Sequence, residues 1–76
     1  MVNGIAQKLL NWIKETGPTL SGDAYNQERI DEVDDFLSGH SPCPASMDPS
    51  EEAFALTNSD AISEAIWELM NEEARA

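Results

Sequence analysis

The single histidine and the single cysteine of this chain, His40 and Cys43, could together provide a base and a nucleophile. They lie three residues apart in a proline-rich stretch, and prolines stand on both sides of Cys43. No third residue that would orient the histidine can be identified beside them. We interpret both as ordinary loop residues and expect a protein that is not an enzyme. The alternative, a small Cys–His enzyme, would require a reactive Cys43 thiol.

Few residues of this chain are suited to binding a metal ion or a phosphate group. One histidine and one cysteine cannot build a zinc site within one chain unless carboxylates complete it. The acidic run at residues 31–35 lacks the Asp-x-Asp-x-Asp-Gly spacing and the distal glutamate of a calcium-binding loop. There is no glycine-rich phosphate loop, and four basic residues are too few to neutralise a nucleic acid. The sequence predicts no metal site, no cofactor and no direct binding of nucleic acid.

Acidic residues dominate the composition of the 76 residues. There are 15 Asp and Glu against 4 Lys and Arg, which gives a formal net charge of −11 at pH 7. The excess lies after residue 22, because the first 22 residues hold only Lys8, Lys14 and Glu15. Such a surface repels nucleic acid and anionic membranes and attracts basic proteins. The apolar fraction of 41% indicates a folded chain.

Acids also recur at the spacing of a helix. Between residues 60 and 72 an acid stands at every fourth position, which gives a ridge with about 6 Å of rise between neighbours. This ridge consists of Asp60, Glu64, Glu68 and Glu72. A similar ridge consists of Glu28, either Asp31 or Glu32, and Asp35, with Asp34 beside it. Like charges at this spacing cost roughly a few tenths of a kcal/mol per pair. Two interpretations remain open: the ridges imitate the regularly spaced phosphates of DNA, or they are the solvated faces of helices.

Apolar residues at helical spacing predict the elements that carry these acids. A first helix is expected over about 3–15, capped by Asn3 and ended by Gly17-Pro18. Its apolar positions are Ile5, Leu9, Trp12 and Ile13. A second helix is expected from residue 24 or 27 to 37, capped by Asp23 or Asn26. Its buried stripe is expected to be Ile30, Val33 and Leu37, with Tyr25 and Phe36 at the edges.

The second half of the chain begins with a proline-rich loop at 38–48. Asp48, Pro49 and Glu51 then form a start signal for a third helix through about residue 56. Residues 57–60 either break and recap the chain or kink one longer helix. The last helix is expected over about 60–73. Its apolar positions are Ile62, Ala65, Ile66, Leu69 and Met70.

These segments predict an all-α fold, a small bundle of three to four short helices forming a single acidic domain over 1–76. No apolar stretch approaches the roughly 20 residues of a membrane span. The start of the chain lacks the features of a signal peptide, and one cysteine allows no internal disulfide. We expect a cytoplasmic protein.

Two apolar residues fall outside the predicted stripes. Trp67 lies toward the acidic side of the last helix, and Leu10 lies off the stripe of the first helix. Each either packs against another helix or marks a binding surface, including that of a homodimer, because tryptophan is enriched where partners bind.

Small, compact acidic proteins of this kind resemble the DNA-mimic inhibitors of phages and mobile elements, which include anti-restriction proteins, anti-CRISPR proteins and inhibitors of uracil-DNA glycosylase. Residues 14–17 (Lys-Glu-Thr-Gly), 27–28 (Gln-Glu) and 56–61 (Leu-Thr-Asn-Ser-Asp-Ala) look like pieces of the last of these. That family relies on a β-sheet, which this sequence does not predict, and no site residues are carried over from it. The resemblance implies a phage-encoded anti-defence protein in the host cytoplasm.

The sequence therefore predicts a non-catalytic inhibitor or modulator that occupies the basic nucleic-acid-binding surface of a partner protein by DNA-like negative charge. The residues expected to contact the partner are Glu28, Asp31, Glu32, Asp34, Asp35, Glu64, Trp67, Glu68 and Glu72. The alternative is a helical adaptor or small subunit that docks through an apolar helix face, with its acidity serving solubility.

Overall fold

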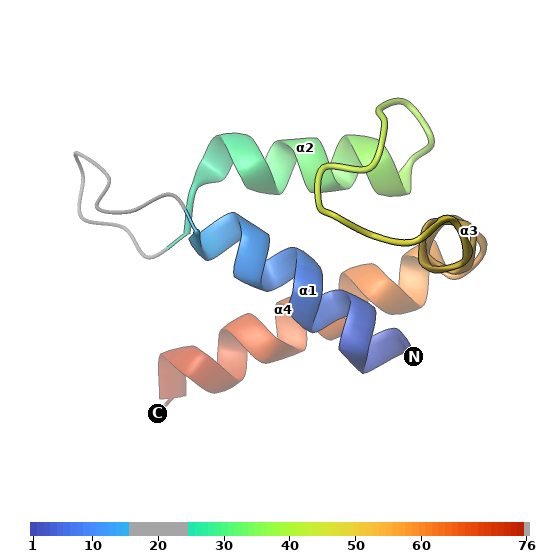
Figure 1. Cartoon of the computed structure of the whole chain (residues 1–76). Coiled ribbons are helices and arrows are strands. Elements are labelled where there is room, and N and C mark those ends of the chain that lie inside the picture. Colours follow the sequence, from blue (N-terminus) through green and yellow to red (C-terminus); the bar gives the residue numbers. More distant parts are fainter. Residues whose placement is uncertain (16–24, 76) are drawn as a thin grey trace.

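Four helices and no strand make up the part of the chain that the computed structural model describes, residues 1–15 and 25–75 (Figure 1). The helices are α1 (Val2–Lys14), α2 (Gln27–Leu37), α3 (Pro49–Thr57) and α4 (Ser59–Arg75). The all-α prediction is confirmed. The expected stop at Gly17-Pro18 and the candidate cap Asp23 lie outside the described residues.

Helix α1 forms the centre of the bundle. It crosses the middle of Figure 1 with α2 above it and α4 below it, and α3 lies at one end. Helix α1 contacts all three other helices, most extensively α4, while α2 also contacts α4. Helix α2 runs in the opposite direction to α4 (Figure 1). Between α2 and α4 this arrangement leaves a seam, which Ile13 of α1 also lines.

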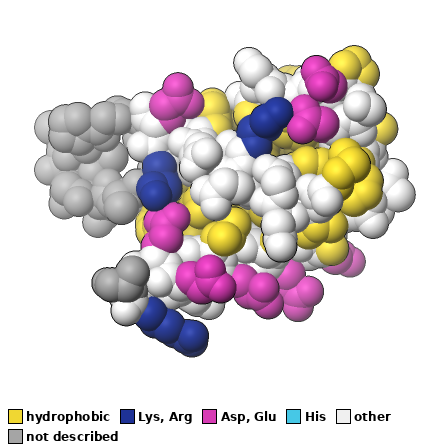
Figure 2. Space-filling view, turned by 60° about the horizontal axis from the view of Figure 1, so that its bottom comes forward, with side chains coloured by type: hydrophobic (Ala, Val, Ile, Leu, Met, Phe, Trp, Pro, Cys, Tyr) yellow, Lys and Arg dark blue, Asp and Glu magenta, His cyan; other side chains and the backbone are white. Residues whose placement is uncertain are grey.

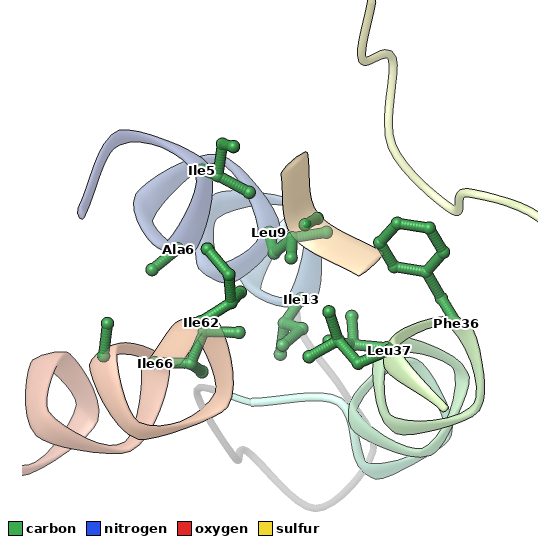
Figure 3. Close-up of a cluster of buried hydrophobic side chains, with 11 residues drawn as sticks. Ile5, Ala6, Leu9, Ile13, Phe36, Leu37, Ile62 and Ile66 are labelled. Atoms are coloured by element: carbon green, nitrogen blue, oxygen red, sulfur yellow. The ribbon is translucent and has the colours of Figure 1, made fainter. Parts of the chain in front are cut away.

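The core collects apolar side chains from all four helices (Figure 3). Its buried members are Ile5, Ala6, Leu9, Ile13, Val33, Phe36, Leu37, Ala55, Ile62, Ala65 and Ile66. One sequence prediction is wrong here, because Phe36 is fully buried instead of lying at the edge of the stripe. Of the two alternatives for Leu10, packing inside the bundle is the correct one, because Leu10 is also fully buried. Because α1 is contacted by helices on several sides, more than one of its faces is buried.

The helix starts are set mainly by capping. The expected cap Asn3 is wrong, because Met1 caps α1 and its carbonyl already accepts a hydrogen bond from the Ile5 N–H at 3.0 Å. For α2, the later of the two expected starts is correct. The Asn26 side chain accepts hydrogen bonds from the N–H groups of Glu28 (2.9 Å) and Arg29 (3.4 Å).

The chain between α2 and α3 has no regular structure over residues 38–48, as predicted. Ser38 ends α2, and Gly39 follows with a φ of 81°, a conformation that glycine adopts without strain. Pro49 is the first residue of α3, and the Glu51 side chain accepts a hydrogen bond from the Asp48 N–H at 3.0 Å.

Helices α3 and α4 are separate, so the prediction of a break is confirmed over that of one kinked helix. Asn58 ends α3, and both its N–H (2.9 Å) and its side-chain amide (3.0 Å) donate to the Phe54 carbonyl. The next residue, Ser59, begins α4. This tight join fixes the direction in which α4 starts, and therefore which of its faces meets α2.

Candidate protein-binding surface

The two lysines of α1 are paired with acids that lie outside the predicted contact set. The Lys8 ammonium lies 3.0 Å from Glu51, and the Lys14 ammonium lies 2.9 Å from Glu73. The Tyr25 hydroxyl also donates to Glu73, at 2.8 Å. These are the ion pairs found within the described ranges. Both lysines of α1 therefore already have an acidic partner.

Both partner glutamates are held in their ionised form. The pKa of Glu51 is lowered by the hydrogen bond from the Asp48 backbone and then by the one from Lys8. The pKa of Glu73 is lowered by the hydrogen bonds from Lys14 and then Tyr25. These pairs tie α3 and the end of α4 to α1 and belong to the scaffold.

The arginine of α2 is also turned toward α1. The Arg29 guanidinium stacks over the Trp12 ring at 4.4 Å from its centroid and donates a hydrogen bond to the Trp12 carbonyl. The fourth basic residue, Arg75, lies at the end of α4 beside Glu68 and Glu72. In Figure 2 two basic side chains lie directly beside acidic ones, while the row of acids along the lower edge has a basic side chain only at its end. Three of the four basic side chains thus have a partner within the bundle: Lys8 and Lys14 pair with glutamates, and Arg29 stacks on Trp12.

The seam between α2 and α4 carries a small hollow of about 10 Å³ that is lined by both apolar and polar side chains. Its α2 wall contains Ile30, Asp34 and Leu37, and its α4 wall contains Ser63, Trp67 and Met70. Figure 3 shows Ile13 of α1 between the buried side chains of α2 and α4 that close the floor. An open depression of about 550 Å³ continues the hollow toward α3 and shares three of these residues. We call the α2–α4 surface the set Ile30, Asp34, Leu37, Leu56, Asp60, Ser63, Trp67 and Met70.

Two large apolar side chains are exposed on this surface. Trp67 is 52% exposed and Leu56 is 42% exposed, whereas the core residues are nearly all below 9%. Of the two interpretations of Trp67, a surface position is therefore the correct one. Trp67 lines the hollow between the two helices, and Leu56 lines the open depression that continues it toward α3.

Asp34 is an exposed acid that lines both the hollow and the open depression. Its pKa is raised above the ordinary value of an aspartate, first by partial burial and then by the negative charges of Asp31 and Asp35. The last turn of α2 contains no basic residue that would offset this cost. A cation from outside the described part of the chain would therefore stabilise the ionised form of Asp34.

The structure brings together only part of the predicted contact set. Asp31 lies one turn before Asp34 on α2, and the charges of Asp31 and Asp35 act on Asp34, which lines the α2–α4 surface. Glu64 lies one turn before Trp67 on α4.

The other predicted acids lie elsewhere. Glu28 is exposed in the first turn of α2, and the exposed Glu32 lies one turn after Arg29, whose guanidinium stacks on Trp12. Glu68 and Glu72 lie beside Arg75, in a separate depression at the end of α4. The two acid ridges therefore do not form one continuous surface.

Sequence reasoning missed Leu56 and left Asp60 out of the contact set. The signal was present in part, because Asp60, Ser63, Trp67 and Met70 share one side of a helix. The spacing could not show that this side meets Ile30, Asp34 and Leu37, since that depends on the join at Asn58.

The residues considered for catalysis are not brought into a site. His40 is exposed, and the half-buried Cys43 thiol donates to the Ala45 carbonyl at 3.1 Å. Across residues 1–15 and 25–75, no group of three His, Cys, Asp or Glu side chains could hold a metal ion. None of the helices described is long and apolar enough to cross a membrane.

No known protein family, curated protein or solved structure matches this chain.

Proposed function

We propose that this chain is a non-catalytic binding protein whose α2–α4 surface occupies the basic, nucleic-acid-binding surface of a partner protein. The observation that carries the proposal is the division of charge. Helix α2 holds five carboxylates and one arginine, and that arginine turns to Trp12. The acids around Trp67 therefore lack the internal cations that Glu51 and Glu73 have, within the described residues.

Electrostatics favours an external cation at this surface. Carboxylates spaced along two helices hold counterions, and a basic partner would release those counterions on binding. Partial burial of Asp34 makes its charge costly without a partner. The proposed complex should therefore weaken steeply as the salt concentration rises.

A phage-type inhibitor working in a host cytoplasm remains the form of this proposal that fits a net charge of −11. The likeness to inhibitors of uracil-DNA glycosylase lies in charge and size, because the described residues form no strand. The partner is then a protein whose natural ligand is a nucleic acid, and DNA should compete with this chain for it.

The test is affinity capture on the immobilised full chain from a bacterial lysate, at roughly 50 mM and 200 mM salt. Duplex DNA is added as a competitor. The proposal expects captured proteins that are released by DNA and by the higher salt. Reversal of Asp34 at the surface together with its neighbours on α2, as Asp31→Lys, Asp34→Lys and Asp35→Lys, should abolish their capture.

A matched control reverses the same number of charges elsewhere, at Glu15, Glu32 and Glu72. All three side chains are exposed and none lines the α2–α4 surface. The control should keep much more of the captured protein than the surface reversal does. Equal capture by the surface reversal and the unchanged chain would refute the proposal.

A second candidate function, docking of an adaptor through apolar contacts, is favoured by the exposure of Trp67 and Leu56. It expects capture that resists both salt and DNA but is lost on Trp67→Ala. The same capture experiment therefore separates the two functions.

A further inference from the structure

We infer that the α2–α4 surface receives a basic amphipathic helix of the partner, with apolar side chains set over Trp67 and Leu56 and lysines or arginines at the surrounding acids. This inference rests on the proposed function and names the shape and chemistry of the bound segment.

The surface has the length of a short bound helix. Helices α2 and α4 run in opposite directions (Figure 1). The hollow between them is lined by Asp34 and Ser63 as well as by Ile30, Leu37, Trp67 and Met70. From Asp60 to Met70 the surface follows α4 for about 15 Å, which corresponds to about three turns of a bound helix. Helices that bind in grooves place apolar residues at i, i+3, i+4 and i+7 over this length.

The acids of the surface require that the bound segment of the partner carry positive charge. Asp34 and Asp60 both line the depression beside Leu56, and Glu64 follows one turn after Asp60. A lysine or arginine can lay its aliphatic stem on Trp67 or Leu56 and still reach such a carboxylate. An acidic or neutral helix would leave the same carboxylates uncompensated and partly desolvated.

A second copy of this chain is a poor occupant. Two such surfaces would bring acids against acids, and each copy carries a net charge of −11. Helix α1 has two lysines and no acid, but its apolar residues are buried in the core. A nucleic acid and an anionic membrane are repelled for the same electrostatic reason.

The experiment measures the binding of three synthetic peptides to the full chain by isothermal titration calorimetry. The first is a Leu/Lys peptide patterned as an amphipathic helix. The second has the same composition with its leucines dispersed, and the third is a Leu/Glu helix of the first pattern. The inference expects the first to bind at least about tenfold more tightly than the second, and the third not to bind.

Variants then locate the binding. Trp67→Ala and Leu56→Ala should each weaken the first peptide, the tryptophan change by about tenfold or more, as for an interface anchor. Asp34→Asn should weaken it severalfold, whereas the matched control Glu72→Gln should leave it unchanged. Both apolar side chains are exposed, and circular dichroism checks that each variant keeps its helices.

The failures can be told apart. Equal binding of both Leu/Lys peptides that still falls with salt and is unaffected by Trp67→Ala would overturn the helix inference and leave the proposed function standing. If the affinity for the peptides changed neither with salt concentration nor on reversal of Asp31, Asp34 and Asp35, the proposed function would be overturned. A dimer in light scattering that Trp67→Ala dissolves would also overturn the inference, because a second copy would then be the occupant.

Discussion

Asp34 is expected to cost the free protein stability, so Asp34→Asn should stabilise the fold while it weakens partner binding. The ionised carboxylate lies in the last turn of α2, where the partial negative charge of the helix end opposes it. It also lies one turn after Asp31 and beside Asp35. Asparagine keeps the size and the helix propensity of aspartate and removes only the charge.

The magnitude follows from these two effects. Repulsion by a like charge one turn away is worth roughly 0.2–0.5 kcal/mol, and an acid at a helix C-terminus costs roughly 0.3–1 kcal/mol. Since Asp34 is exposed and salt screens both effects, we expect the variant to gain about 0.5–0.8 kcal/mol in unfolding free energy at low ionic strength. For a domain of this size the melting temperature should rise by about 2–6 °C.

The pH dependence has a definite sign. The folded-state pKa of Asp34 is raised, so the ionised form is less favourable in the folded chain than in the unfolded chain. Below the ordinary pKa of aspartate the carboxyl is protonated in both states, and the variant should match the original chain. The gain should develop as the pH rises through the raised pKa and be complete above it.

Glu28→Gln is the matched control, because Glu28 lies in the first turn of the same helix. There an acid is favourable, and its neutralisation should lower the unfolding free energy by about 0.3–1 kcal/mol. Thermal and urea denaturation followed by circular dichroism at neutral and acidic pH measures both variants. A shift of the same sign and size in both would refute the reasoning, since net charge and not position would then govern stability.

Three further predictions concern the scaffold. Asn26→Ala should lower the unfolding free energy by about 1 kcal/mol, because two N–H groups of α2 lose their cap, as urea denaturation would show. Glu73→Gln should cost about 0.2–1 kcal/mol at neutral pH through the lost Lys14 pair, and this cost should vanish as the pH falls through the lowered pKa of Glu73. Leu10→Ala should cost about 2–5 kcal/mol in the same denaturation assay because Leu10 is fully buried, and an unchanged stability would contradict that burial.

Much of the fold could be predicted from local sequence signals. The capping residues Asn26 and Asp48, the proline at the start of α3 and the break at Asn58 each act within a few residues of themselves. Such signals can be recognised without knowledge of the rest of the chain. The number of helices and most of their bounds were predictable for this reason.

The burial of Leu10 and Phe36 was not predictable in the same way. A periodic pattern identifies one apolar stripe, but α1 is contacted by α2, α3 and α4 and therefore buries more than one stripe. The same limit applies to the candidate surface. Sequence spacing placed Asp34 and Trp67 on their own helices, whereas the packing of α2 against α4 placed them on one hollow.

The position of Asp34 bears on whether the acids serve solubility or binding. An acid that only keeps a protein soluble is most effective where water surrounds it fully, as on the outer sides of α2 and α4. Asp34, although exposed, lines a hollow beside Trp67, and partial desolvation there is the main reason that its pKa is raised. A neutral polar residue there would avoid that cost in a chain of 76 residues, whose small core leaves little stability to lose. The proposed function would account for a carboxylate at this position through a cation that arrives with a partner, and the opposite effects of Asp34→Asn on stability and on binding would test it.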